Sequence, residues 1–295
     1  MISVEKRGKP TVALVNKGFV NDALSAASSR GMPGLRVLAE SIASECIVPE
    51  QIEAGVGAVL EDIIAALTKP LTEEEKSPVR EIVKPSRIVF EGSLDDVNTF
   101  FYKRGWTDGL LVKPPTEEAV LEMLKGTDLP PDHLVATCPP RLGKATVERI
   151  AINAVMAGAL PTYMPVLIAG VQALIEYGYF QGQAVSAGSW APCYLINGPI
   201  RHDLRVNSGP GVMSPGDMAN ATIGRAMGLI VKNIGGIRKG MEDMGTMGNP
   251  GKYTLVIAEN EEESPWEPLH VQGSFEINDS ALSIFMQDSV SSNTR

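Results

Sequence analysis

The sequence predicts an α/β protein, and two patterns along the chain carry this prediction. First, short runs rich in β-branched residues alternate with segments of helical periodicity between residues 11 and 67, which is typical of a parallel sheet. Second, residues 146–177 form two segments dense in Ala, Gly, Val and Met with few charges, as in buried helices. We therefore expect a flavodoxin-like or Rossmann-like first half and a helix-rich α/β second half.

The first half contains two predicted strands and two predicted helices. A strand at Thr11–Val15 precedes a helix at Asn21–Arg30. A second strand at Leu35–Leu38 precedes a longer helix at Pro49–Leu67, whose apolar residues recur on one face.

A linker is predicted at residues 69–86, because this segment is rich in Pro, Glu and Lys. It separates an α/β domain over residues 1–68 from an α/β domain with buried central helices over residues 87–295. We expect the charges of the linker to be solvated and to carry no chemistry.

Local signals place further elements in the second half. Ser93 and Asp96 form a predicted capping box for a helix that stops at Gly105, and Thr116 starts a helix that runs to about Lys125. Short β-branched or apolar runs predict strands at Arg87–Glu91, Leu110–Val112, Leu134–Ala136, Tyr253–Ala258 and Ser280–Phe285.

Composition excludes several classes of partner. The chain has 295 residues, of which 44% are hydrophobic and 21% charged, and its formal net charge is −9. Without a long basic run, such a protein is not expected to bind nucleic acid or an anionic membrane. No apolar run is long enough to span a membrane, and the charged N-terminus does not resemble a signal peptide. Cys46, Cys138 and Cys193 are far apart in the sequence, which fits a reducing compartment, so we expect a cytoplasmic protein. We also expect a homodimer.

A glycine-rich loop followed by a helix start marks residues 197–236. The loop is Asn207–Gly211. Ser214 is a predicted helix cap, Asp217 completes an imperfect capping box, and the helix should run to about Ile234. Free backbone N–H groups and the positive helix end can hold a carboxylate or phosphate. The alternative is that loop and helix pack closely because their residues are small.

Polar residues follow the predicted strand that ends at Ala258. His270 is a candidate general base, and Glu262 can orient it or act as the acid. If the protein holds a divalent metal, the expected ligands are Glu259, Glu262 and His270, although their spacing matches no standard metal motif. The alternative is a solvated acidic run and a packing histidine.

A second group of candidates lies at Cys138, Arg141 and Glu148. Cys138 is a candidate nucleophile, although most lone cysteines are packing residues. Glu148 stands in an otherwise apolar helix and is a candidate acid–base group if it is buried, or simply an exposed residue if it is not.

Arg225, together with Arg201 and the Asn207–Gly211 loop, is a candidate for binding an anionic substrate. It lies in mid-helix among apolar residues, and a buried arginine needs an anionic partner, either a substrate or a carboxylate of the protein. His202 and His133 look incidental. The predicted substrate-binding residues are Arg141, Asn197, Arg201, Asn207, Ser208, Gly209, Asn220, Arg225, Lys252 and Tyr253.

Several segments together resemble a known family. They are Arg104–Gly109 with Pro114–Glu117, Thr146–Gly158, Asn197–Ile200, Ala219–Arg225, and Glu259–Glu262 with Ser264–Pro268. The chain thus resembles, over about residues 10–285, a poorly described bacterial and fungal family related to UGSC-type (seleno)proteins. Those relatives carry selenocysteine or cysteine in a Gly-Ser-Cys context that this chain lacks. The resemblance therefore implies neither thiol redox chemistry here nor any settled reaction.

These residues predict an enzyme that acts on a small anionic, carboxylate-bearing molecule by acid–base lyase or hydrolytic chemistry. His270 and Glu262 would share proton transfer. One alternative is a thiol-dependent enzyme that uses Cys138. Another is a non-catalytic subunit that binds a small ligand or serves as a scaffold.

Overall fold

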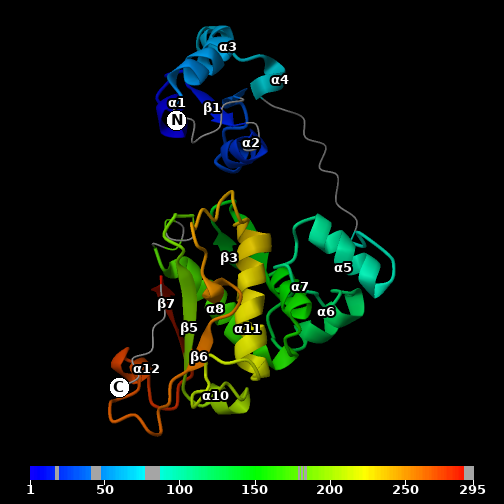
Figure 1. Ribbon diagram of the computed structural model, residues 1–295, viewed down its shortest axis with the longest axis vertical. Coiled ribbons are helices and arrows are strands. Elements are labelled where there is room, and N and C mark those ends of the chain that lie inside the picture. The colour runs from blue at the N-terminus through cyan, green and yellow to red at the C-terminus, as the bar shows by residue number, and fades with distance from the viewer. Residues whose placement is uncertain are drawn as a thin grey trace. The chain divides into compact units, whose positions relative to one another are not determined.

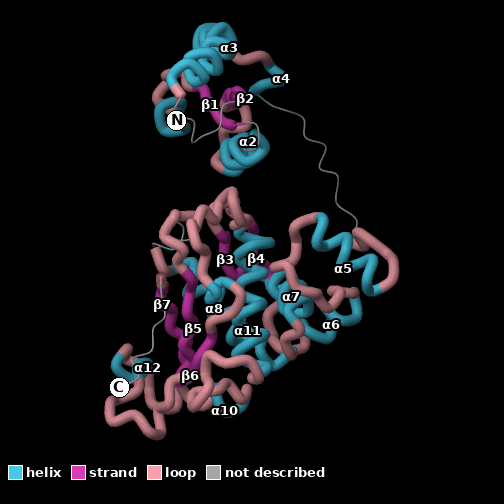
Figure 2. Tube along the Cα trace, viewed as in Figure 1, coloured by secondary structure: helices cyan, strands magenta, loops and turns pink. Residues whose placement is uncertain are grey.

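The structure is a computed structural model that describes residues 1–16, 20–40, 48–76, 87–178, 180, 182 and 185–288. The chain divides into two compact units, Met1–Arg87 and Ile88–Arg295. The described residues form helices and three small sheets, a mixture compatible with the predicted α/β class (Figures 1 and 2). Cys46 and residues 77–86 of the predicted linker lie outside the described residues.

The first unit contains a parallel pair of strands. In this pair, Val12 of one strand lies opposite Arg36 of the other. The predicted alternation of strand, helix, strand and helix is confirmed, because the strands and helices alternate along Val12–Thr68. The elements of this unit are α1 (Ile2–Glu5), β1 (Val12–Asn16), α2 (Val20–Ser29), β2 (Arg36–Glu40), α3 (Pro49–Thr68) and α4 (Glu73–Lys76).

Arg36 holds the start of the predicted linker against the first unit. Its guanidinium donates to the carbonyls of Ala66 at 2.6 Å and Lys69 at 2.7 Å, and it pairs with Glu75 at 3.0 Å. Residues 69–76 are therefore part of the folded unit, because the half-buried Arg36 binds the carbonyl oxygen of Lys69 and the carboxylate of Glu75.

The second unit is built on a three-stranded sheet with β5 (Ala191–Asn197) in the middle. β6 (Val256–Ala258) pairs with it in parallel, and β7 (Ala281–Gln287) pairs with it antiparallel. A separate antiparallel pair joins β3 (Leu134–Cys138) to β4 (Gly143–Thr146). The strands predicted near residues 134, 253 and 280 are thus confirmed with shifted ends, whereas the sequence showed no signal for β4.

Two predicted strands of the second unit do not form. Residues 87–91 and 110–112 are irregular. Phe90 instead stacks on Phe100, with 4.5 Å between ring centroids, and the backbone N–H of Val112 donates to the Asn98 side chain at 2.7 Å. Side-chain contacts therefore replace the strand partner that each run would need.

The helices of the second unit follow their local signals closely. Ser93 and Asp96 form the predicted capping box at the start of α5, and Thr116 and Thr146 cap the two helices that follow in the chain. The helices are α5 (Leu94–Lys103), α6 (Glu117–Leu124), α7 (Val147–Ala157), α8 (Met164–Glu176), α10 (Ile200–Asp203), α11 (Met218–Ile230) and α12 (Leu269–Gln272), with 3-10 turns at Pro161–Tyr163 and Pro250–Lys252 and a π-turn at Val231–Gly235.

The start of α11 differs from the prediction. The helix begins at Met218 with Asp217 at the cap position, and Ser214 lies in the preceding turn. The Asp217 carboxylate accepts from the Asn207 amide at 2.8 Å and does not reach back as a capping box. The predicted end is confirmed, because the π-turn stops at Gly236, whose φ is +81°.

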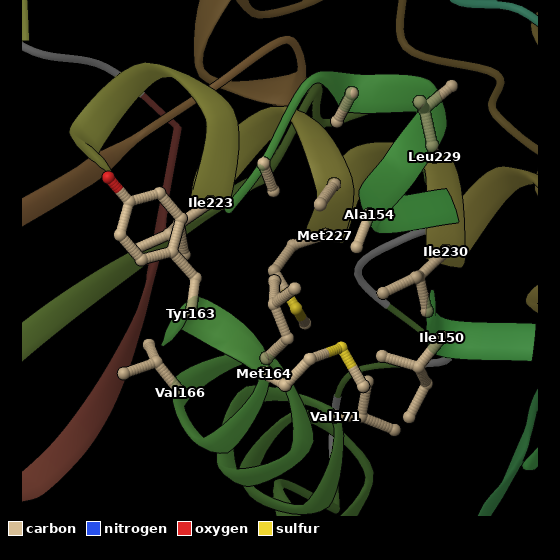
Figure 3. Close-up of a cluster of buried hydrophobic side chains, with 14 of the residues drawn as sticks. Ile150, Ala154, Tyr163, Met164, Val166, Val171, Ile223, Met227, Leu229 and Ile230 are labelled. Carbon is tan, nitrogen blue, oxygen red and sulfur yellow. The ribbon is translucent and has the colours of Figure 1, made fainter. Parts of the chain in front are cut away.

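The core of the second unit lies where α7, α8 and α11 meet. Figure 3 shows Ile150 and Ala154 of α7 facing Met164 and Val171 of α8, with Met227 of α11 between them. All of these side chains are buried, as the charge-poor sequence predicts. Within the described ranges, no helix combines the length and the apolar character that crossing a membrane requires.

Candidate functional site

The ends of β5 and β6 bring the first group of candidate residues together. The two strands are parallel neighbours, so the residues after Asn197 and after Ala258 leave the sheet at the same edge. Arg201, in the short helix α10 that follows β5, meets the acidic run that follows β6. We call the group Asn197, Arg201, Glu259, Glu261 and Glu262 the Arg201 cluster.

Arg201 is the centre of this cluster and is 5% exposed. Its two terminal nitrogens donate to the two carboxylate oxygens of Glu262 at 2.7 and 2.9 Å. One of them also donates to Glu261 at 3.0 Å, and the other to the backbone carbonyl of Glu259 at 3.2 Å. The guanidinium is therefore already paired with carboxylates of its own chain and is not free for a substrate carboxylate.

The buried amide of Asn197 connects the other two carboxylates. Its nitrogen donates to Glu259 at 2.5 Å and to Glu261 at 3.0 Å. The backbone N–H of Gly198 donates to Glu261 at 2.7 Å, and that of Leu269 donates to Glu259 at 2.9 Å. Each carboxylate therefore has protein donors, whereas the buried Oδ1 of Asn197 and Nε of Arg201 have no hydrogen-bond partner among the described residues.

The carboxyl groups of the cluster are held ionised. Hydrogen bonds from Arg201 lower the pKa of Glu262 to about 2. Burial alone would raise the pKa of Glu261, but the hydrogen bonds from Gly198 and Asn197 and the charge of Arg201 lower it overall. A carboxyl group with these properties is a poor proton donor near neutral pH, which argues against Glu262 as the acid.

His270 is buried and lies apart from Glu262. Its Nε2 is 3.4 Å from the carbonyl oxygen of Ile277, and its Nδ1 is 3.9 Å from Glu261 with no hydrogen-bond partner among the described residues. Glu262 instead contacts His202, whose Nε2 is 3.0 Å away. His202 thus takes the place beside Glu262 that was expected for His270, and the expected His270–Glu262 pair does not form.

Acid is expected to weaken the Arg201 cluster. Because the folded-state pKa of Glu262 lies below its ordinary value of 4.5, the cluster contributes stability above pH 4.5 and loses it as the pH falls toward 2. The gain is small, since this side chain is 54% exposed. We expect the urea midpoint to fall less steeply with acid in Glu262→Gln than in the wild type. The exposed Glu118→Gln is the control, and an unchanged acid slope in Glu262→Gln would contradict this role.

The three residues expected to bind a divalent metal, Glu259, Glu262 and His270, do not point to a common site. The carboxylate of Glu259 faces Asn197, and that of Glu262 faces Arg201 and His202. Among the residues that the structure describes, no three His, Cys, Asp or Glu side chains are placed to hold a metal ion. The arrangement therefore does not support this metal set.

The glycine-rich loop uses its polar groups internally. Asn207 and Asn220 exchange hydrogen bonds at 2.8 and 3.2 Å, and the Asn220 amide also donates to the carbonyl of Val256 at 3.0 Å. The Gly209 N–H donates to the side chain of Asn207 at 2.8 Å, beside Ser208. The loop therefore fastens the start of α11 to β6, as the packing alternative predicts.

A cavity of about 160 Å³ lies along α11 from Gly224 onward. Its lining comes mainly from α11 and its π-turn, the start of β5 and residues 237–253. Figure 1 shows α11 beside β5 and β6 in the second unit. Three predicted binding residues line it: Arg225, Lys252 and Tyr253. Arg201, Asn197 and the Asn207–Gly211 loop do not, so the predicted binding residues divide between two places.

Two glycines on α11 allow residues 252–254 to pack closely against the helix at the cavity wall. A Cβ at Gly224 would lie 2.3 Å from the Thr254 hydroxyl oxygen, and one at Gly228 would lie 2.8 Å from the Lys252 carbonyl oxygen. Arg225, Gly228 and Lys232 follow one another at helical spacing on the face that lines the cavity. The segment around Lys252 can therefore lie directly against this face.

Positive charge exceeds negative charge in the cavity lining. Its charged residues are Arg225, Lys232, Lys239 and Lys252 against Asp108 and Asp243. Arg225 donates to Asp108 at 2.7 and 3.0 Å, and Lys252 pairs with Asp243 at 2.6 Å. The structure thus realises the salt-bridge alternative for Arg225, while Lys232 and Lys239 have no ion-pair partner among the described residues.

Burial shifts the pKa of both Lys232 and Tyr194 in this lining. Desolvation by burial lowers the pKa of the Lys232 ammonium, which the charge of Asp108 opposes. Burial also raises the pKa of Tyr194, whose hydroxyl has no hydrogen-bond partner in the described part of the chain. Sequence reasoning missed Lys232, Tyr194, Asp108 and Asp243. The spacing of Arg225, Gly228 and Lys232 was the available signal.

Cys138, Arg141 and Glu148 lie outside the cavity lining. Cys138 is 4% exposed, and burial raises the pKa of its thiol to about 11, opposite to the shift that activates a nucleophile. Arg141 pairs with Glu242 at 2.9 Å. Glu148 is half-exposed, so the premise of a buried carboxylate is wrong. These positions give the thiol-dependent alternative no support.

In the comparison with known protein families, only the first 69 residues of the chain give a match. Residues 1–69 match the model of the UGSC family. This part of the chain is related to UGSC-type proteins. No curated protein and no solved structure matches the chain. The match to the UGSC family lies in the first unit, whereas the Arg201 cluster and the cavity lie in the second unit.

Proposed function

We propose that this protein is an enzyme that binds a small carboxylate-bearing molecule in the cavity and converts it by acid–base lyase or hydrolytic chemistry. The observation that carries this proposal is the excess of positive charge around a cavity in a chain whose net charge is −9. Apolar walls lower the local dielectric constant, which strengthens the attraction of these cations for an anion. Lys232 is the best-placed acid–base group, because burial lowers the pKa of its ammonium.

The size of the cavity limits the ligand. A protein cavity of about 150 Å³ holds one benzene molecule, or about six non-hydrogen atoms. The cavity here is about 160 Å³, so it suits a small organic acid.

Calorimetric titration with small carboxylates such as lactate, malonate and pyruvate tests the proposal. We expect Lys232→Met to weaken binding roughly ten- to a hundredfold, since a hydrogen bond to a charged group contributes about 1.5–3 kcal/mol. The control is Lys125→Met, whose ammonium pairs with Glu122 on the surface. Binding without turnover of any carboxylate would favour the non-catalytic ligand-binding alternative, and unaltered binding in Lys232→Met would contradict this use of the cavity.

We also propose a cytoplasmic homodimer whose first unit is a shortened flavodoxin-like or Rossmann-like arrangement. The parallel pair β1–β2, with α2 between the two strands in sequence, supports the flavodoxin-like or Rossmann-like arrangement. The exposed apolar residues Ile52, Val56 and Leu60 of α3 support the homodimer. Light scattering on the purified protein measures the oligomeric state.

A further inference from the structure

Lys232 differs from the other cations of the cavity in its surroundings. Arg225 is paired with Asp108, Lys252 is paired with Asp243, and Lys239 is exposed. Lys232 is half-buried on the π-turn that continues α11, and among the described residues it has neither an ion-pair partner nor a side-chain hydrogen bond.

An amine in this position is suited to attack a carbonyl carbon. Only the uncharged amine is nucleophilic, and lysines that react in this way sit in desolvating pockets or beside other cations. The cavity provides the first condition, because the apolar residues Leu229, Val231 and Ile237 line it together with Lys232. Desolvation by burial lowers the pKa of Lys232 accordingly.

We propose that Lys232 is a nucleophile that forms an imine with a small 2-oxo acid held in this cavity. This inference rests on the proposed function, which supplies the carboxylate-binding cavity. Attack on an ester or amide would leave a stable amide on lysine, whereas imine formation with an aldehyde or ketone is reversible. The carbonyl carbon and the carboxylate must lie within about six non-hydrogen atoms, which a 2-oxo acid satisfies.

The step balances without an oxidant or a reductant. The lone pair of the Lys232 Nζ forms a bond to the carbonyl carbon, and the carbonyl π pair moves to oxygen, which takes up a proton. The nitrogen loses its proton, and the carbinolamine then expels water to give the imine. The protonated imine withdraws electrons from the neighbouring carbon, which is the chemistry that a lyase requires.

Reductive trapping tests the inference. The wild-type protein is incubated with pyruvate or glyoxylate and cyanoborohydride, which delivers hydride to a protonated imine and makes the bond permanent. We expect intact mass spectrometry to show one added reduced group, and peptide mapping to place it on Lys232. Lactate carries the same carboxylate without the carbonyl, so it should slow trapping and form no adduct.

Variants separate this inference from the proposed function. Lys232→Arg keeps the positive charge and cannot form an imine, so it should bind lactate and lose the adduct, whereas Lys125→Arg should keep both. Binding of lactate and pyruvate without an adduct on Lys232, or an adduct spread over surface lysines, would overturn the inference and leave the proposed function standing. Absence of binding as well as of adduct would overturn both.

Discussion

Arg201→Met is expected to lower the free energy of unfolding of the second unit by roughly 3–5 kcal/mol, because it leaves the buried carboxylate of Glu261 without its cation. Arg201 is 5% exposed and Glu261, one of its partners, is 9% exposed in its side chain. In the wild type, the charge and hydrogen bonds of the Arg201 guanidinium favour the ionised form of both Glu261 and Glu262. Methionine fills a similar volume, so the loss reports on charge and not on a cavity.

Urea unfolding followed by tryptophan fluorescence measures this effect. All three tryptophans of the chain, Trp106, Trp190 and Trp266, belong to the second unit, so the signal reports on that unit alone. Lys125→Met breaks an exposed pair and should change stability by less than about 1 kcal/mol. Adding Glu261→Gln to Arg201→Met should recover part of the loss, since it removes the stranded charge. Equal stability of Arg201→Met and wild type would show that the cluster is not a stabilising ion pair.

Gly198→Ala is expected to cost roughly 2–5 kcal/mol, from a strained backbone and a steric clash together. Gly198 follows β5 with φ of +81°, and a Cβ there would lie 1.9 Å from the carbonyl oxygen of Asp279. Its N–H also donates to Glu261 at 2.7 Å. Either the segment before β7 must therefore move, or residue 198 must move and weaken its hydrogen bond to Glu261.

Gly158→Ala separates the two contributions to this cost. Gly158 has nearly the same φ, +82°, but a Cβ there would meet nothing within 4 Å. It should lose only the backbone part, about 1–2 kcal/mol. Similar losses in the two variants, measured by the same fluorescence assay, would show that the close approach to Asp279 relaxes at little cost.

Elements with local signals were predictable from the sequence. The capping box at Ser93 and Asp96, the threonine caps of α6 and α7, and the stop at Gly236 all depend on groups within a few residues of one another. The strand predicted at Leu110–Val112 failed for the opposite reason. A strand needs a partner strand from elsewhere in the chain, whereas the backbone N–H of Val112 donates to the side chain of Asn98.

The candidate site depended on contacts that no local pattern encodes. The sequence by itself determined the acidic balance, the charge-poor helices and the polar residues after β6, because composition and short-range periodicity set them. Only the tertiary structure decided that Arg201 meets Glu262 across 61 residues and that Arg225 meets Asp108 across 117. Sheet order and helix packing bring such pairs together, and these pairings leave Lys232 as the unpaired, half-buried amine of the cavity.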